Sequence, residues 1–270
     1  MITILKHRSN ICLHKSHTGY ETQPRSLQLA TSTSQQYITL PCQFPRFNAY
    51  NAKELENVKV TQEEVQYLKK TCGYLSTSYF HFLENFRFKP KEHLQLTFLP
   101  HSDIGDHDER GDIHMLVKGK WIDTILYEIP LLALTSEAYF KFIDTDWTYH
   151  GQSEKAKEKG KRLIEAGCVF SEFGSRRRRD YHTHDLILQG LKEAQKEGEE
   201  KGWSGKLSGS SNVHFAMKYG IPPVGTVAHE WFMGVAAITD SYKTATETAL
   251  DYWVATFGQG VSCDYLTTNH

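Results

Sequence analysis

The stretch CVFSEFG (residues 168–174) is an apolar run that ends in small and charged residues, and the helical pattern RRRDYHTHDLILQGLKEAQKE (residues 177–197) follows it. The same change recurs in KLSGSSN (206–212) and in PVGTVAHE (223–230), and helical patterns follow there too. Strands that alternate with helices at this spacing predict βα units and a parallel sheet or barrel. We therefore expect an α/β fold in which residues 168–258 form three parallel strands, each followed by a helix.

Polar side chains gather in the segments that end these strands, which are residues 173–176, 209–212 and 226–230. In βα barrels the chemistry lies at the carboxyl ends of the strands. We expect the three segments to converge at one end of the sheet, where they would form a site.

Four consecutive arginines, residues 176–179, lie where the first strand gives way to its helix. A helix N-terminus carries partial positive charge, which disfavours cations. A phosphate or carboxylate bound there would satisfy both the guanidinium groups and the free backbone N–H groups. Two other interpretations stay open: a solvated run in which one or two arginines pair with Glu172, Asp180 or Asp185, and a nucleic-acid patch.

The overall composition is that of a soluble globular protein. The 270 residues include 31 basic and 32 acidic side chains, for a net charge of −1. This balance argues against electrostatic binding of the whole chain to nucleic acid or to a membrane. Five cysteines without a C-x-x-C pair favour free thiols in a reducing compartment. We expect the chain in the cytoplasm, with the nucleus as an open second location.

The N-terminal region has two contrasting parts. Residues 1–45 are rich in basic and hydroxyl side chains and lack a sustained period. We interpret them as the bulk of a disordered leader that extends to residue 55, and we favour this over an organellar transit peptide. Beyond it, Thr61 and Glu64 form a capping-box pattern that predicts the start of a helix.

Two alternating patterns predict a hairpin of strands with one buried face. The first carries Leu94, Leu96 and Phe98, and the second spans residues 113–117. The acidic loop between them, PHSDIGDHDERGD (100–112), lacks the ligand spacing of a calcium loop, so we interpret it as a solvated hairpin loop.

Several motifs occur in the order SEFGSRRRR, SGSSN, YGIPPVGTVAHEW and MGVAA. In this order they resemble the nicotinate phosphoribosyltransferase family of the fungal and bacterial type, from about residue 56 to residue 258. The resemblance implies the type II phosphoribosyltransferase fold, in which an α/β domain packs with an irregular βα barrel. It also implies that nicotinate and phosphoribosyl pyrophosphate give nicotinate mononucleotide and pyrophosphate in NAD salvage. ATP, hydrolysed to ADP and phosphate, and Mg²⁺ are the implied co-substrate and metal.

The resemblance also implies roles for individual residues. Phe173 matches the ring that stacks on the pyridine, and Arg176 matches the arginine that holds the phosphoribosyl group. Ser211 and Thr226 match positions that face the pyridine ring and its carboxylate. His229 matches the histidine that takes a phosphoryl group from ATP. Imidazole suits this role because one ring nitrogen stays nucleophilic near neutral pH.

Other histidines receive no role in the site. We interpret His182, His184 and His214 as surface or helix residues. Glu230, next to His229, would point the other way on a strand and is not expected to orient it.

The family's opening motif has no match in the leader, and its later strands have no match beyond Gly258. We therefore expect a chain truncated at both ends, and pairing into a homodimer is left open. The alternative function is an inactive remnant that binds nucleotide or pairs with a full-length subunit. The expected organisation is a leader (1–55), a partial α/β N-terminal domain (56–122), a helical connector (123–167), a partial βα barrel (168–258) and an atypical tail (259–270).

Overall fold

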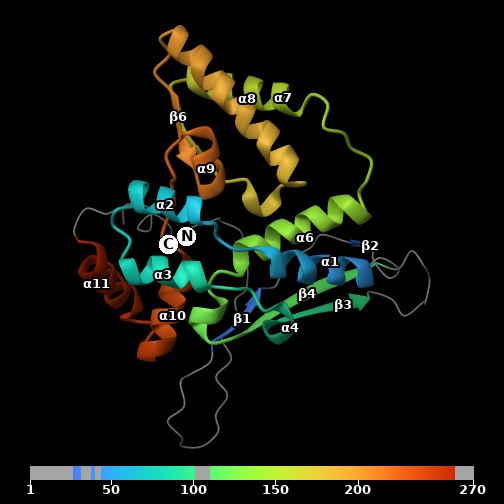
Figure 1. The fold of residues 1–270 in the computed structure, drawn as a ribbon, viewed down its shortest axis with the longest axis vertical. Helices are drawn as coiled ribbons and strands as arrows, with labels where there is room; N and C mark the ends of the chain where they lie inside the picture. Colours follow the sequence, from blue (N-terminus) through green and yellow to red (C-terminus); the bar gives the residue numbers. More distant parts are fainter. Residues whose placement is uncertain (1–26, 32–37, 40–43, 101–109, 259–270) are drawn as a thin grey trace, which may run out of the picture.

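The computed structural model describes residues 27–31, 38–39, 44–100 and 110–258, and these form two parts (Figure 1). The first, here called the sheet part, contains β1 (Leu27–Thr31), β2 (Ile38–Thr39), α1 (Phe44–Asn57), α2 (Gln62–Thr71), α3 (Thr77–Asn85), α4 (Pro90–His93), β3 (Leu94–Pro100), β4 (Arg110–Gly119), α5 (Trp121–Thr124), α6 (Glu128–Phe142), α10 (His229–Thr239) and α11 (Ala245–Phe257). The second, here called the helix-pair part, contains α7 (Gln152–Glu165), β5 (Val169–Glu172), the 3₁₀ turn η1 (Ser175–Arg177), α8 (Tyr181–Glu200), β6 (Lys206–Ser210) and α9 (Val213–Tyr219).

Strand β4 is the centre of an antiparallel sheet and pairs with β1, β2 and β3. In the hairpin, Leu96 lies opposite Met115 and Phe98 opposite Ile113. The side chains of Met115 and Ile113 are buried in a core with residues of α1 and α6. The alternating pattern is confirmed, because every second residue of both strands faces this core. The loop expected over residues 100–112 is shorter than predicted, because residue 100 belongs to β3 and residues 110–112 belong to β4, and residues 101–109 lie outside the described residues.

The predicted capping box is confirmed at the start of α2. The Glu64 N–H donates to Oγ1 of Thr61 (3.2 Å), and the Thr61 N–H donates to Oε2 of Glu64 (2.8 Å). Each side chain satisfies a backbone donor that the first helical turn leaves free. Helix α2 therefore begins directly after its cap residue Thr61, as the pattern predicts.

The predicted disordered leader is wrong for the part of it that the structure describes, because residues 27–31 and 38–39 form β1 and β2, which pair with β4. Residues 44–55 belong to α1, and both Asn51 and Leu55 are fully buried. The Tyr50 hydroxyl donates to Glu137 of α6 (2.7 Å), so the helix is held against its neighbour. Burial of this face stabilises the segment despite its polar composition. Residues 1–26 lie outside the described residues.

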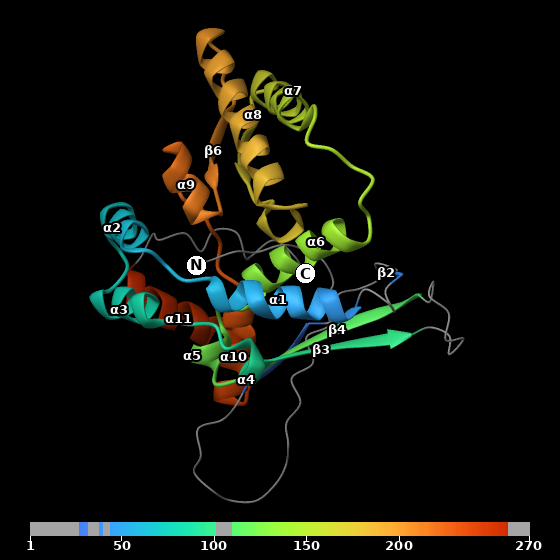
Figure 2. The ribbon, with the colours of Figure 1, turned by 45° about the vertical axis from the view of Figure 1, so that its right-hand side comes forward.

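The helix-pair part contains a two-stranded parallel sheet. Val169 of β5 lies opposite Lys206 of β6, and Glu172 lies opposite Ser210. Each strand leads into a helix, α8 after β5 and α9 after β6, as the sequence predicts. Helix α9 lies beside β6 (Figure 2). Two of the expected βα units are therefore confirmed.

The third expected strand, residues 223–230, is wrong. The segment makes one parallel bridge, between Ser210 and Pro223, and the Val224 N–H donates to the Ser210 carbonyl (3.0 Å). Pro222 and Pro223 have no N–H group to donate, which limits pairing along the segment. The chain then leaves the sheet, and His229 is the first residue of α10.

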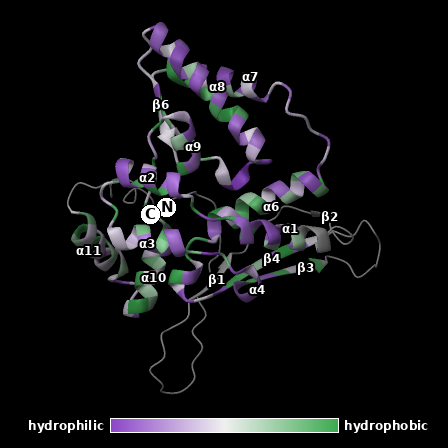
Figure 3. Cartoon of the chain, in the orientation of Figure 1, coloured by the Kyte–Doolittle hydropathy of each residue, from purple (hydrophilic) through white to green (hydrophobic). Residues whose placement is uncertain are grey.

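Helices α7 and α8 pack along each other in both views (Figures 1 and 2). Both are mostly hydrophilic with interspersed hydrophobic residues, whereas α10 is mostly hydrophobic (Figure 3). Because α7 pairs with α8, the boundary expected at residue 167 separates two helices that form one unit.

Within the part of the chain that the structure describes, no helix has the length and apolar character needed to cross a membrane.

Candidate functional site

The ends of β5 and β6 are bound to each other. The Ser211 N–H donates to the Glu172 carbonyl (2.9 Å), and the Asn212 side-chain amide donates to Oγ of Ser175 (3.0 Å). These bonds bring residues 173–176 and 210–212 together at the carboxyl ends of two parallel strands. Convergence is confirmed for these two of the three expected segments.

A buried carboxylate, that of Glu172, lies beneath these strand ends. Its Oε2 accepts from the Ser210 hydroxyl (2.6 Å), and its Oε1 accepts from the Gly174 N–H. Oε1 also lies 3.0 Å from Nε2 of His184. Burial alone raises the pKa of Glu172, but His184, Ser210 and the Gly174 N–H together outweigh it and hold the pKa below its ordinary value.

His184 is 1% exposed, so its interpretation as a surface residue is wrong, although it does lie on helix α8. Its ring contacts Phe215 edge-on, with 4.5 Å between ring centroids. Neither ring nitrogen of His184 has a well-aligned hydrogen bond among the described residues. The approach of its Nε2 to Oε1 of Glu172 is therefore a close polar contact and not a hydrogen bond of good geometry. The sequence gives no direct signal for this burial, because the contact joins α8 to the end of β5.

Two of the four arginines form ion pairs with helix α6. Arg176 pairs with Glu128, and its side chain is 13% exposed. Arg178 lies 3.8 Å from Glu137, and both side chains are largely buried. These partners differ from the three acids that the sequence suggested, because α6 approaches η1 from the sheet part.

The other two arginines have different surroundings. The guanidinium of Arg179 lies 5.2 Å from the ring centroids of both Phe140 and Trp147, a cation–π arrangement. Arg177 is exposed. Asp180 accepts from the Thr183 N–H (2.6 Å) and thereby caps α8. Three of the four arginines therefore contact neighbouring elements, and the fourth, Arg177, faces solvent.

The remaining predicted residues differ in exposure. Phe173 is half-buried directly after β5, and Ser211 is buried directly after β6. Thr226 is half-buried, and its hydroxyl oxygen is buried without a hydrogen-bond partner among the described residues. His229 is exposed. Phe173, Arg176 and Ser211 belong to the joined segments, whereas Thr226 and His229 lie beyond the bridge at Pro223.

Two family models match the chain. A model described as the nicotinate phosphoribosyltransferase family matches residues 168–268. A second model, described as the N-terminal domain of the same family, matches residues 49–136. The chain belongs to the nicotinate phosphoribosyltransferase family.

Relatives support the assignment over a large part of the chain. A protein of Schizosaccharomyces pombe named a probable nicotinate phosphoribosyltransferase is 50% identical over 204 residues, which cover 76% of this chain and 47% of that protein. The nicotinate phosphoribosyltransferase of Saccharomyces cerevisiae is 48% identical over 174 residues, covering 64% of this chain and 40% of that protein. The chain spans about half the length of the curated relatives it matches.

A solved structure shares the fold. The crystal structure of a putative nicotinate phosphoribosyltransferase from Saccharomyces cerevisiae aligns with a TM-score of 0.77 at 41% identity. The alignment covers 88% of this chain and 57% of that chain. The described α/β arrangement is therefore that of part of a nicotinate phosphoribosyltransferase, and the predicted type II phosphoribosyltransferase fold is confirmed.

Glu230, next to His229, is a functional candidate, although from the sequence it is not expected to orient that histidine. Glu230 belongs to the first turn of α10 and is 8% exposed. The indole N–H of Trp121 donates to its Oε1 (2.7 Å). Burial, and to a lesser degree the charge of Glu128, raise the pKa of Glu230 to about 7. The sequence predicts Glu230 on a strand, pointing away from His229, but it lies on helix α10. A helix directs neighbouring side chains differently from a strand, so the expected orientation does not apply.

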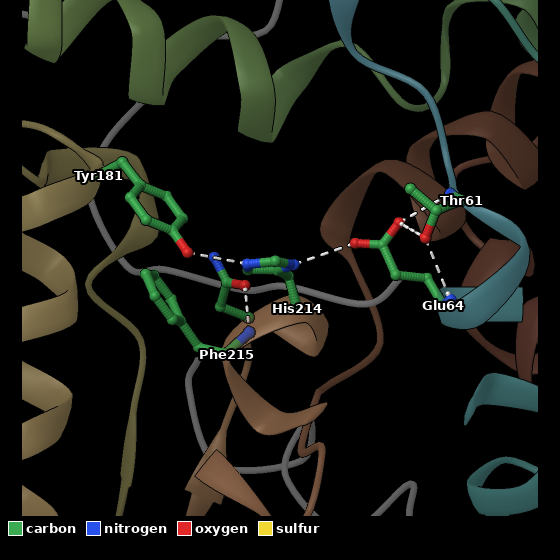
Figure 4. Close-up of polar contacts among 6 residues, drawn as sticks. Thr61, Glu64, Tyr181, His214 and Phe215 are labelled. Carbon is green, nitrogen blue, oxygen red and sulfur yellow. Dashed lines mark hydrogen bonds and ion pairs between the residues drawn. The ribbon is translucent and has the colours of Figure 1, made fainter. Parts of the chain in front are cut away.

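The two parts of this family member also meet through a polar chain of side chains (Figure 4). His214 of α9 lies between the Tyr181 hydroxyl, 2.9 Å from Nε2, and the Glu64 carboxylate, 3.0 Å from Nδ1. His214 is a half-exposed helix residue, as predicted. It connects α8 and α9 of the helix-pair part to α2 of the sheet part.

Metal ligands do not gather in the described part of the chain. Across residues 44–100 and 110–258, no three His, Cys, Asp or Glu side chains lie close enough to hold an ion. The described residues therefore do not form a protein cage for Mg²⁺.

Proposed function

We propose that this chain acts in the ATP-coupled synthesis of nicotinate mononucleotide from nicotinate and phosphoribosyl pyrophosphate, in NAD salvage. The products besides the mononucleotide are pyrophosphate, ADP and phosphate. The observation that carries the proposal is the joining of the segments that contain Phe173, Arg176 and Ser211 at the ends of parallel strands. The names of its relatives support the same activity.

The nicotinate ring is assigned to Phe173 and two hydroxyl residues. Phe173 is half-buried, so one part of its ring is available to stack on an aromatic ligand. The buried hydroxyl of Thr226 has no protein partner among the described residues, and a ligand carboxylate would give it one. Ser211 places a second hydroxyl at the strand end.

The phosphoribosyl group is assigned to Arg176, with Arg177 beside it. A guanidinium group binds phosphate oxygens through two parallel N–H bonds, which a lysine could not do. Arg176 is paired with Glu128, so an anion has to share or replace this carboxylate. Arg177 is exposed and can approach the same anion from solvent.

His229 is proposed to carry the phosphoryl group that links ATP to the reaction. An unprotonated ring nitrogen attacks the γ-phosphorus of ATP, the bond to the β-phosphate oxygen breaks, and ADP leaves with the electron pair. Water later cleaves the N–P bond and releases phosphate. Because His229 is exposed and is the first residue of α10, the helix N-terminus would stabilise the added negative charge.

We propose Mg²⁺ as the companion of ATP. Mg²⁺ typically binds through one or two carboxylates and the phosphates of a substrate, so it requires no cage of protein ligands. We also propose a cytoplasmic location, with the nucleus as an open second one, and a homodimer; fluorescence imaging and analytical ultracentrifugation would test these.

Calorimetry with nicotinate mononucleotide tests the proposed site directly in the 270-residue chain. We expect the chain to bind the mononucleotide, and Arg176→Ala to weaken binding by roughly 10–100-fold, as for loss of a charged hydrogen bond. Phe173→Ala should weaken binding through loss of ring stacking. Arg162→Ala is the matched control, because Arg162 is exposed and pairs with Glu158 on the surface of α7. Equal binding by the Arg176 and Arg162 variants would contradict the assignment.

A further inference from the structure

Two carboxyl groups share one small cavity at the junction of α6 and α10. Glu128, the first residue of α6, and Glu230, in the first turn of α10, both line it. The other lining residues are uncharged: Val117, Thr124, Ile125, Tyr127, Leu131 and Leu132. In such surroundings two negative charges repel more strongly than in water.

The two carboxyl groups have different partners. Glu128 forms the ion pair with Arg176, the residue assigned to the phosphoribosyl anion. Glu230 accepts the indole N–H of Trp121 (2.7 Å), and among the described residues the side chains that shift its pKa, Trp121 and Glu128, include no cation. Burial is the main cause that raises its pKa to about 7, and Glu128 adds to it. Glu230 therefore exchanges a proton near neutral pH.

Trp121 fixes the helix that bears Glu230. Its ring stacks on Trp231, with 6.2 Å between the ring centroids. It also occupies the space beside Gly234, where a Cβ atom would overlap the indole. Three contacts along α10, at Glu230, Trp231 and Gly234, therefore depend on Trp121, and the orientation of the N-terminus, where His229 lies, depends on them.

We propose that Glu128 links the anion site at Arg176 to the start of α10, so that Glu230 gains a proton when an anion draws Arg176 away from Glu128. The proposal rests on the proposed function for the identity of the anion, but the link itself requires only an anion at Arg176. The proton comes from solvent. The physical cause is that Glu128, once separated from its cation, exerts its full negative charge on the second carboxyl group in the cavity.

Few other charged or titratable groups face Glu230. The Tyr127 hydroxyl accepts the Lys89 N–H (2.7 Å) and lies 3.2 Å from Nδ1 of His93. Burial raises the pKa of Tyr127 to about 12, so it does not titrate near neutrality. His229 is adjacent in sequence but exposed. Glu230, acted on by Glu128, is therefore the group assigned to the proton uptake.

The link has a consequence for His229. A neutral Glu230 still accepts the Trp121 hydrogen bond, so the helix keeps its position. The N-terminus of α10 then carries one negative charge fewer, which favours a phosphoryl group on the adjacent histidine. By linkage, a phosphoryl group there favours an anion at Arg176 to the same degree. Glu128 and Glu230 are thus positioning residues that act through Arg176 and α10.

Sulfate is the probe for the test, because this dianion does not titrate between pH 6 and pH 8. Its dissociation constant would be measured by NMR titration across this range in the 270-residue chain. We expect wild-type affinity to fall as pH rises, by about threefold for each half unit by which the bound anion raises the Glu230 pKa. Glu230→Gln should lose this component, since glutamine keeps the acceptor but cannot take up a proton.

A second variant gives an independent test. Glu128→Gln frees Arg176 from its ion pair and removes the charge that acts on Glu230. We expect tighter sulfate binding and a smaller dependence on pH. Glu158→Gln is the matched control, because Glu158 is an exposed partner of Arg162 and lies on α7. Each variant's fold would be verified by circular dichroism before titration.

The link is overturned if Glu230→Gln keeps the wild-type dependence on pH, or if Glu128→Gln behaves like Glu158→Gln. Absence of sulfate binding by the wild-type chain would overturn both the anion site and the link. If sulfate binds with the Glu230 component but nicotinate mononucleotide binds no better than sulfate, the link stands and the proposed function fails.

Discussion

Nε2 of His184 lies 3.0 Å from Oε1 of Glu172, and both side chains are buried under the strand ends that carry the candidate site. The same carboxylate holds the Ser210 hydroxyl and the Gly174 N–H. One charged group therefore ties β5, β6 and α8 together directly beside Phe173. A buried carboxylate is costly unless polar groups surround it, so each of these partners contributes to the position of the site.

Replacing His184 tests this arrangement. His184→Phe keeps an aromatic ring against Phe215 but leaves Glu172 facing an apolar group. We expect a loss of roughly 1–3 kcal/mol in the free energy of unfolding, measured with urea, because a polar partner of a buried charge is removed. His184→Gln, which retains a donor, should lose less. If the two variants were equally stable, the contact with Glu172 would contribute only packing.

The acid sensitivity of the fold should also depend on Glu172. Its pKa is held below the ordinary value in the folded chain, so it stabilises the fold above its unfolded pKa. This contribution is lost as pH falls through the folded pKa. We expect the unfolding free energy of wild type to decline more steeply below about pH 4.5 than that of Glu172→Gln. Parallel acid limbs in urea titrations of the two proteins would argue against it.

The contact between the two parts predicts a measurable change at Glu64. Burial raises its pKa, but the Thr61 N–H and His214 outweigh this and hold the pKa below its ordinary value. His214→Ala should therefore move the Glu64 titration upward in ¹³C NMR spectra. The loss of unfolding free energy should stay below about 1 kcal/mol, because His214 is partly exposed. His150→Ala, at an exposed position, should leave Glu64 unchanged.

Gly190 permits the close approach of α7 and α8. A Cβ atom at this position would lie 2.9 Å from the backbone nitrogen of Lys157 and 3.0 Å from Cβ of Ala156, and nearer still to the backbone carbonyl oxygen of Ser153. Alanine favours a helix by about 1 kcal/mol over glycine, but overpacking costs about 1–3 kcal/mol. Because backbone atoms of α7 cannot yield easily, we expect Gly190→Ala to lower the melting temperature. Gly73→Ala, with nothing within 4 Å, should change it little.

Local patterns in the sequence predicted the local structure well. Thr61 and Glu64 defined the start of α2, and the alternation around Met115 defined the buried face of β4. These signals depend on residues a few positions apart, so they survive without knowledge of the fold. The prolines at 222 and 223 are a local signal that the expected third strand did not take into account, and they explain why that strand shortens to one bridge.

Contacts between distant segments could not be predicted in the same way. Arg176 pairs with Glu128, 48 residues earlier, and nothing in the arginine run indicates that partner. The burial of His184 likewise depends on how α8 packs over β5 and α9. The residue types of the site were accessible from the motifs, whereas the charges that surround them required the fold.

Phosphorylation of His229 is the remaining prediction. Its exposed ring at the first residue of α10 is accessible to ATP, and the helix N-terminus favours an added negative charge by about 0.3–1 kcal/mol. With γ-labelled ATP and Mg²⁺, we expect the chain to acquire acid-labile, base-stable label, as for a phosphohistidine. His229→Ala should lose the label, whereas His114→Ala, at another exposed position, should keep it. Label that persisted in the His229 variant would assign the phosphoryl group to a different residue and remove His229 from the proposed coupling.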